Sequence, residues 1–358
     1  MQLCAFKWAI LAHVALPTGV NFFATIDGRK TALRFETAEG AYLFSYTGED
    51  YFWLAEPKRI NFHPILSIPE YNDVVFRRIY AEDDTNLFSG GIADPTKYSL
   101  VHLFFEIENE KEINDSIIFR HLREWAAKVY NDFINLYAAV TGDVTISKLN
   151  LTELPSVMVW TTNKYSISDT AMEANFSLYS GKAEITWRDP RKIGQIKIEA
   201  SRDAVNKLAE RWRVNYRLKP FEQLLIDAKE QSLFRGNHDL SIVISETAFE
   251  IFIQSSLIAA SEQKKRTSFP NKRDKKAKDI NYKQAIERGN IHTLFWYIEL
   301  LTKKDVTRFP EYRAWKDDAY QLRNEIIHRG GRGYSENQAE GAFNVVNRFI
   351  DAVKQVLS

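Results

Sequence analysis

The spacing of apolar residues changes near residue 200, and this change restricts the chain to a mixed architecture. Up to about residue 200, aromatic and β-branched residues gather in short runs between Gly, Pro, Asp and Asn, which is typical of strands. From Asp203 onward, apolar residues recur every three or four positions, as they do along one face of a helix. The sequence therefore predicts an α+β region over residues 1–200 and an all-helical bundle over residues 203–358.

Strand-like runs and one helix outline the first region. A helix is expected over residues 115–139, because Ile118, Leu122 and Trp125 begin a series of apolar residues at helical spacing. The segment 88–92 is interpreted as a loop between strands, since it contains two glycines. Strands are expected at residues 31–35, 41–46, 51–54, 101–107, 156–160, 175–179, 183–187 and 195–199.

Helices with clear start and stop signals fill the second region. Pro220 suits the first turn of a helix that Gly236 ends, and Asn237 is placed to cap the next helix. That next helix, over residues 239–260, is apolar on nearly every side, which indicates a central and buried element. Further helices are expected at residues 282–288, 291–302 and 311–328, and after a capping box formed by Ser335 and Gln338.

Charge and cysteine content favour a reducing compartment and no global attraction to nucleic acid or membranes. The 48 Lys and Arg nearly balance the 47 Asp and Glu, so a local patch would have to bind any such partner. Cys4 is the single cysteine, so one chain builds neither a disulfide nor a thiolate zinc site. No apolar stretch approaches the roughly 18 residues of a membrane span, and His13 interrupts the apolar run after Lys7 that would otherwise mimic a signal peptide. A cytoplasmic protein without a membrane segment is expected.

The expected helix over residues 311–328 separates apolar from polar side chains. At about 100° per residue, Arg323 lies at the edge of an apolar stripe, whereas Asn324 and His328 share the polar face. A glycine-rich turn follows, so the imidazole of His328 lies on the last helical turn, where the helix dipole favours its protonated form. The apolar stripe faces the core and consists of Tyr312, Trp315, Ala319, Leu322 and Ile326.

A helical bundle whose late helix carries Arg, a polar residue and His at this spacing, before a Gly-rich turn and a last amphipathic helix, resembles the HEPN superfamily. The buried segment 245–252 is similar to the matching helix of its Apea-like branch. The resemblance covers roughly residues 203–358. Many members are metal-independent endoribonucleases that act in antiviral defence or as regulated toxins. The resemblance implies a homodimer in which each subunit contributes Arg323, Asn324 and His328 to the site.

The chemistry implied by this resemblance needs neither a metal nor a cofactor. When the ribose 2′-OH attacks the adjacent phosphate, a base takes its proton, an acid protonates the departing 5′ oxygen, and a cation stabilises the phosphorane. His328 suits the base or the acid, because imidazole titrates near neutrality. Arg323 suits the phosphate through its bidentate guanidinium, and Asn324 would position Arg323 or His328. The requirement for a 2′-OH would make the enzyme specific for RNA, with tRNA as one candidate.

Other charged residues have two open interpretations each. Glu246 and Glu250 lie four residues apart on the apolar helix, and they are either structural carboxylates or supporting partners for Arg323 or His328. The basic segment that starts at Lys264 is either a solvated insertion or a contact for the RNA backbone. The candidate RNA-binding residues are Lys264, Lys265, Arg266, Lys272, Arg273, Lys275, Lys276, Arg329 and Arg332.

Two alternative functions stay open. The helical region would be a non-catalytic HEPN module that binds nucleotides or protein partners, with residues 1–200 as the recognition unit. Alternatively, Trp53, Trp160 and Trp187 would line a carbohydrate or small-ligand site, although core packing also accounts for them. In the ribonuclease interpretation, residues 1–200 form a sensing or regulatory region that a phage product or a small molecule triggers.

Overall fold

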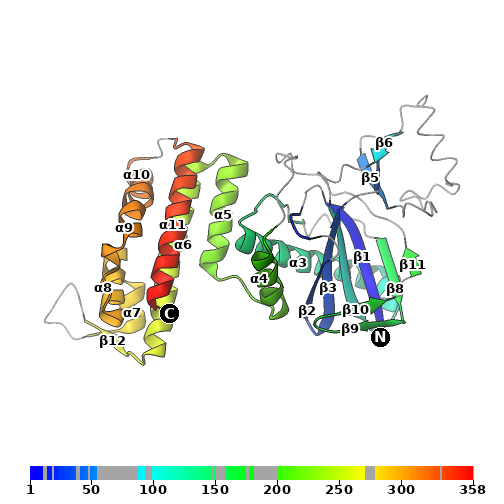
Figure 1. Cartoon of the computed structure of the whole chain (residues 1–358), viewed down its shortest axis with the longest axis horizontal. Coiled ribbons are helices and arrows are strands. Elements are labelled where there is room, and N and C mark those ends of the chain that lie inside the picture. The colour runs from blue at the N-terminus through cyan, green and yellow to red at the C-terminus, as the bar shows by residue number, and fades with distance from the viewer. Residues whose placement is uncertain are drawn as a thin grey trace. The chain divides into compact units, whose positions relative to one another are not determined.

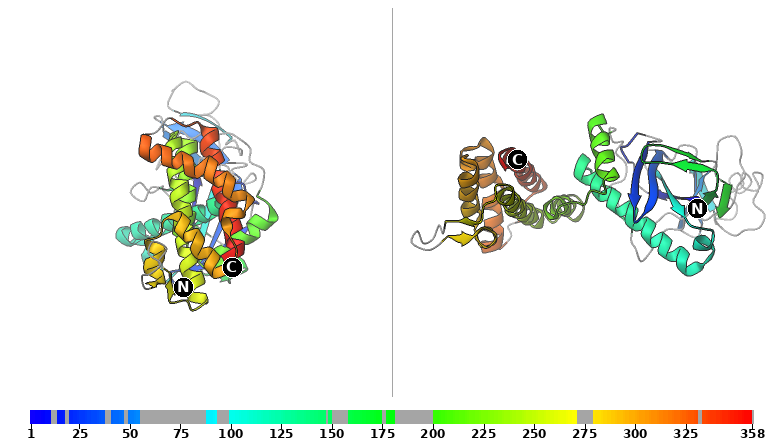
Figure 2. Two further views of the ribbon diagram at one scale, coloured as in Figure 1. Left: turned by 90° about the vertical axis from the view of Figure 1, so that its left-hand side faces the viewer. Right: turned by 90° about the horizontal axis from the view of Figure 1, so that it is seen from below.

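A computed structural model divides the chain into two compact units, Met1–Arg217 and Leu218–Ser358. We call them the sheet unit and the helical unit (Figures 1 and 2). An antiparallel sheet followed by helices confirms the predicted α+β class. The structure describes residues 1–10, 14–17, 20–37, 41–46, 49–54, 88–92, 99–146, 148–149, 158–174, 177–180, 200–270, 279–330 and 333–357.

The main sheet of the sheet unit is antiparallel, with the strand order β11-β8-β1-β7-β3-β2. β1 lies near its middle and pairs with both β7 and β8. Asp27 and Gly28 join β2 to β3 with positive φ angles, the conformation of a tight hairpin turn that matches the twist of its strands. The strands are β1 (Gln2–Ile10), β2 (Asn21–Ile26), β3 (Arg29–Thr37), β7 (Ser99–Ile107), β8 (Met158–Thr162) and β11 (Ser177–Ser180).

Two smaller sheets complete the strand pattern and correct one prediction. The segment 88–92, expected as a loop, forms β6, which pairs with β4 so that Gly90 lies opposite Phe44. Pairing satisfies the backbone N–H and C=O groups whatever the side chains are, so it overrides the local glycine signal. The predicted strands at residues 183–187 and 195–199 lie outside the described residues. The remaining strands are β4 (Ala41–Tyr46), β5 (Glu49–Leu54), β6 (Phe88–Ile92), β9 (Tyr165–Ile167) and β10 (Met172–Ala174).

The long helix α3 covers one face of the main sheet (Figure 2), which confirms the helix predicted for residues 115–139. Edge-to-face ring contacts attach it to the strands, including Trp8 against Tyr130 and Phe22 against Phe133. Trp212, near the end of α4, packs on Phe133 of α3, so α4 belongs to the sheet unit. The sequence had instead placed the boundary between the two regions near residue 203, at the start of α4. The helices are α2 (Lys111–Asn114), α3 (Ser116–Thr141) and α4 (Arg202–Arg213).

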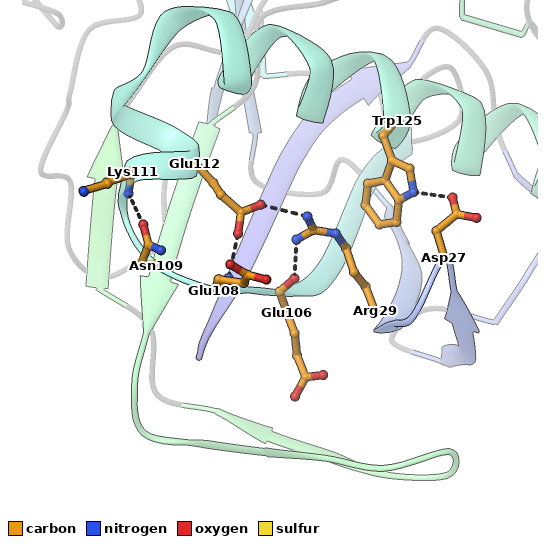
Figure 3. A network of polar contacts seen from close by, with 8 residues as sticks. All are labelled: Asp27, Arg29, Glu106, Glu108, Asn109, Lys111, Glu112 and Trp125. Carbon is orange, nitrogen blue, oxygen red and sulfur yellow. Dashed lines mark hydrogen bonds and ion pairs between the residues drawn. The ribbon is translucent and has the colours of Figure 1, made fainter.

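A polar network joins the β2–β3 hairpin to α2 and α3 (Figure 3). Arg29 donates to the backbone oxygen of Glu106 at 2.8 Å and to the carboxylate of Glu112 at 2.8 Å. Its guanidinium also lies over the ring of Trp125, whose indole N–H donates to Asp27 at 3.0 Å. The hairpin is therefore fixed to the helix layer by charge-assisted contacts in addition to the apolar core.

The helical unit begins with an antiparallel pair of helices, as predicted. Gly236 ends the first helix in the left-handed conformation that favours glycine, with φ of +63°. Asn237 occupies the cap position of the second helix, but its side chain donates to Gln231 instead of making the expected cap bond. At the last helix, Ser335 and Gln338 form the predicted capping contacts. The helices are α5 (Pro220–Arg235), α6 (His238–Gln263), α7 (Tyr282–Glu287), α8 (Ile291–Thr302) and α11 (Glu336–Leu357).

The central helix α6 is apolar on nearly every side, as predicted, although the sequence was expected to contain no apolar stretch of membrane-spanning length. Among the described residues it is the one helix long and apolar enough, by length and composition alone, to cross a membrane. It packs against α5, α8 and α11, and its residues Phe249, Ile253 and Leu257 are fully buried in the core of the unit. A core helix with neighbours on several sides needs this composition, so packing accounts for its apolarity.

The predicted helix over residues 311–328 is not continuous, which corrects that prediction. It consists of α9, a five-residue π-turn and α10. The π-turn adds one residue to one helical turn and so rotates everything that follows by about 100° relative to an uninterrupted helix. Trp315, which precedes the π-turn, and Ala319, which lies within it, are both fully buried in the core. The segments are a short 3₁₀ turn (Val306–Arg308), α9 (Pro310–Trp315), the π-turn (Lys316–Tyr320) and α10 (Gln321–Arg329).

Candidate functional site

Helix α10 presents the predicted site residues at different depths. Arg323 is half-buried, with 25% of its side chain exposed, and it faces α6. His328 is exposed on the last turn, and within the described part of the chain nothing forms a hydrogen bond or an ion pair with it. Leu322 and Ile326 pack against the core as the apolar stripe predicted. Arg323 therefore stays at the margin of the core, while the imidazole is available to solvent.

Arg323 is held by two side chains. Its Nη1 donates to Oδ1 of the adjacent Asn324 at 3.0 Å, and its Nη2 lies 3.7 Å from Oε1 of Glu250 on α6. Glu250 is thus the acidic partner of Arg323, one of the two interpretations that the sequence left open. The Nε atom of Arg323 is buried and has no hydrogen-bond partner among the described residues. Part of the guanidinium remains available for another acceptor.

Glu246 is the one fully buried acidic side chain in the described part of the helical unit. Its Oε1 accepts a hydrogen bond from the indole Nε1 of Trp315 at 2.8 Å, whereas Oε2 is buried and has no hydrogen-bond partner in the part of the chain that the structure describes. Burial raises the pKa of Glu246 to about 8. The hydrogen bond from Trp315 and the positive charge of Arg323 act to lower this pKa, whereas the negative charge of Glu250 raises it. With a pKa near 8, the carboxyl group is mostly protonated at pH 7.

Tyr334, which lies between the Gly-rich segment after His328 and α11, is held by two other helices. Its backbone N–H donates to Oδ1 of Asp239 at the start of α6, and its hydroxyl donates to Glu325 on α10 at 3.0 Å. Gly330 and Gly333 have φ angles of +74° and +70°, a conformation that favours glycine. These contacts join three helices at one end of the unit, next to the exposed imidazole.

Trp315, Tyr334 and Asp239 support the site in the structure but were not predicted as supporting residues from the sequence. Tyr334 directly precedes the cap residue Ser335. An apolar residue at the position before a cap commonly packs back on the helix that follows, so this position could have predicted a structural role for Tyr334. No local pattern marks Asp239 as an acceptor for the turn, or Trp315 as the donor to a buried acid. Those partners are defined by the packing of α6 against α9 and α10.

Of the candidate RNA-binding residues that the structure describes, two make structural contacts and two are exposed. Lys264 donates to the backbone oxygen of Leu301 at 2.7 Å, at the end of α8. Arg266 donates to the backbone oxygen of Ser268 and lies over the ring of Phe269, in a short hairpin of β12 (Ser268–Phe269) and β13 (Ile280–Asn281). Lys265 and Arg329 are exposed. The candidates Lys272, Arg273, Lys275, Lys276 and Arg332 lie outside the described residues.

The tryptophans of the sheet unit give little support to a ligand site. Trp160 is partly buried and packs against an apolar cluster that includes Leu3, Ala5 and Phe104. This placement favours the core-packing interpretation for Trp160. The side chain of Trp53 and the whole of Trp187 lie outside the described residues.

No protein-family model matches the chain, and neither a curated protein nor a solved structure matches it. Function is therefore inferred from the geometry of α10 and its surroundings. No group of three or more His, Cys, Asp or Glu side chains that would suit a metal ion occurs among the described residues.

Proposed function

We propose that the chain is a metal-independent, HEPN-type endoribonuclease that acts in the bacterial cytoplasm, in antiviral defence or as a regulated toxin. The proposal rests on the different environments of Arg323 and His328 on α10. Arg323 is held at the margin of the core by Glu250 and Asn324, and His328 is exposed one turn further on, beside a turn fixed by Tyr334. A fixed cation and an accessible imidazole are what cleavage through the 2′-OH requires.

The reaction is a transesterification in which all protons are accounted for. The bond from the 2′ oxygen to phosphorus forms as the bond from phosphorus to the 5′ oxygen breaks. One imidazole accepts the proton of the 2′-OH, and a protonated imidazole donates a proton to the 5′ oxygen. In the proposed homodimer these are His328 and the partner subunit's His328. Arg323 stabilises the charge on the phosphorane, and the products carry a 2′,3′-cyclic phosphate and a 5′-OH.

The exposed Lys265 and Arg329 are the described residues best suited to contact the RNA backbone. Each neutralised phosphate contributes to binding that weakens as salt rises. The sheet unit serves as the sensing part in this proposal, and a phage product or a small molecule is its trigger.

The test is cleavage of total tRNA by the full-length chain in EDTA, with a single-stranded DNA of matched length as the negative substrate. We expect fragments that end in 2′,3′-cyclic phosphate from RNA alone. The variant His328→Gln should lose about a hundredfold or more in rate, because general acid–base catalysis contributes about that much. His121→Gln is the matched control, since His121 is exposed on α3 in the sheet unit.

Equal cleavage by wild type and His328→Gln would exclude the proposed role of His328. Binding of tRNA by the wild type without any cleavage would instead agree with a non-catalytic helical module. Cleavage that stops in EDTA and returns when a divalent cation is added would argue against the metal-independent mechanism.

A further inference from the structure

The helical unit places two acidic side chains, one buried and one half-exposed, beside one cation. Glu246 and Glu250 are one helical turn apart on α6, and both act electrostatically with Arg323 of α10. Glu250 is half-exposed and makes the ion pair, whereas Glu246 is fully buried and lies deeper. Because Glu246 lies deeper than Glu250, an ionised Glu246 would compete with Glu250 for the guanidinium of Arg323.

Among the described residues, two buried polar atoms of this cluster lack hydrogen-bond partners, namely Oε2 of Glu246 and Nε of Arg323. In neutral Glu246, whose Oε1 accepts from Trp315, Oε2 carries the proton and is a donor, as Nε is; in ionised Glu246, Oε2 is an acceptor. Leaving such groups unpaired costs free energy, and the cost is much larger for a charged group. While Glu246 is neutral, Arg323 can stay with Asn324 and Glu250. An ionised Glu246 would attract the guanidinium inward, since that is the nearest compensation for its charge.

The rest of the surroundings is mostly aromatic. Trp315 donates to Glu246 from α9, and the rings of Tyr312 and Tyr320 lie 5.6 and 5.0 Å from the Trp315 ring. His292 of α8 lies 5.7 Å from the ring of Tyr320, and Phe349 of α11 lies 5.4 Å from that of Trp315. The charged groups that act on Glu246 are Glu250 and Arg323, so its protonation is coupled mainly to the position of that arginine.

We infer that Glu246 is a positioning residue for Arg323: in its neutral form it anchors Trp315 and leaves the guanidinium at the surface for a phosphate, and in its ionised form it withdraws the guanidinium. The expected effect of Glu246 on catalysis rests on the proposed ribonuclease function. The coupling of Glu246, Trp315 and Arg323 does not depend on that function. Glu246 itself touches no substrate.

The first measurement follows Trp315 directly in the full-length protein labelled with 5-fluorotryptophan. The ¹⁹F resonance of Trp315, assigned by its loss in Trp315→Phe, should titrate with a midpoint near the pKa of Glu246, about 8. The titration should vanish in Glu246→Gln and persist in Glu340→Gln, an exposed glutamate on α11. Arg323→Gln should raise the midpoint, because it removes the cation, and Glu250→Gln should lower it, because it removes a like charge.

The second measurement is the pH profile of RNA cleavage. At pH 7, Glu246→Gln should cleave within about threefold of the wild type, because the amide oxygen can still accept from Trp315. One pH unit above its pKa, only about a tenth of Glu246 is protonated, so the wild type should fall to about a tenth of the variant's activity near pH 9. Glu340→Gln should follow the wild type.

The two measurements separate the two proposals. A Trp315 resonance that does not titrate between roughly pH 6.5 and 9.5, or that titrates equally in Glu246→Gln, overturns the positioning role even if RNA is cleaved. Titration with the expected shifts in Arg323→Gln and Glu250→Gln, but without any RNA cleavage, supports the coupling and rejects the ribonuclease. If Glu246→Gln does not fold, the wild-type titration and those two variants still decide the question.

Discussion

At the scale of single residues, Glu246 links the stability of the helical unit to pH. Its pKa is about 8 in the folded chain and near 4.5 when solvated. Below pH 4.5 both states are protonated and the group has no effect. Between 4.5 and 8 the unfolded chain loses the proton that the folded chain keeps, so the free energy of unfolding falls as pH rises. Above 8 both states are ionised, and the loss is complete.

We expect the free energy of unfolding of the helical unit to fall between pH 5 and 8 by a few kcal/mol, with about 5 kcal/mol as the upper limit for a pKa change of this size. Urea unfolding at a series of pH values would measure the slope. Glu246→Gln should remove most of it, and Glu340→Gln should retain it. The same slope in Glu246→Gln would mean that another group is responsible.

Helical geometry alone was enough to predict from the sequence how exposed Arg323 and His328 are relative to each other. The separation between the exposed His328 and the half-buried Arg323 follows from five residues of helix, about 500° of rotation. The partners of these residues were open, because Glu246 and Glu250 look equivalent along the chain. Their depths differ only because Glu246 lies under Trp315 and Glu250 lies at the rim.

At the scale of elements, the π-turn between α9 and α10 sets the direction of Arg323. It follows Trp315, the donor to Glu246, and precedes the helix that carries the candidate site. Leu322 and Ile326 of α10 nevertheless pack against the core, where a regular helix was also expected to place them, so the π-turn leaves the apolar stripe on the core side. No residue in the segment 316–320 is a helix breaker, so the wide turn was not recognisable from sequence.

Deletion of Asp318, which is exposed in the π-turn, should therefore convert the segment to a regular helix. We expect unchanged far-ultraviolet circular dichroism but loss of the contact between Arg323 and Glu250, with RNA cleavage reduced about a hundredfold or more. Asp318→Ala keeps the residue count and serves as the control. Full activity in the deletion variant would show that the π-turn does not orient the site.

The whole molecule divides after Arg217, because α4 packs on the sheet unit through Leu208 and Trp212. A boundary at residue 203 looks natural in the sequence, where α4 is one more helix in a helical region. Contacts between α4 and distant residues such as Phe133 decide otherwise. A sequence pattern shows that a helix has an apolar face, but not which core receives it.

We expect a fragment of residues 218–358 to fold alone with helical circular dichroism and a cooperative thermal transition. A fragment of residues 203–358 should keep that transition but associate beyond the proposed homodimer, because it exposes Leu208 and Trp212. Analytical ultracentrifugation would compare the two, with Trp212→Ser in the longer fragment as the control that restores solubility. Equal association of all three would show that α4 is not the cause.

The sequence by itself determined the mixed class, the positions of most helices, the capping at Ser335 and the polar and apolar faces around His328. These features depend on interactions within a few residues of the chain, which periodicity and capping signals record. Only the tertiary structure decided that residues 88–92 pair as a strand, that α4 belongs to the sheet unit, that a π-turn precedes α10, that Arg323 pairs with Glu250, and that Glu246 is buried and accepts from Trp315. Each of these is a choice of distant partner, and burial and pairing energies override local preference when the partner is far along the chain.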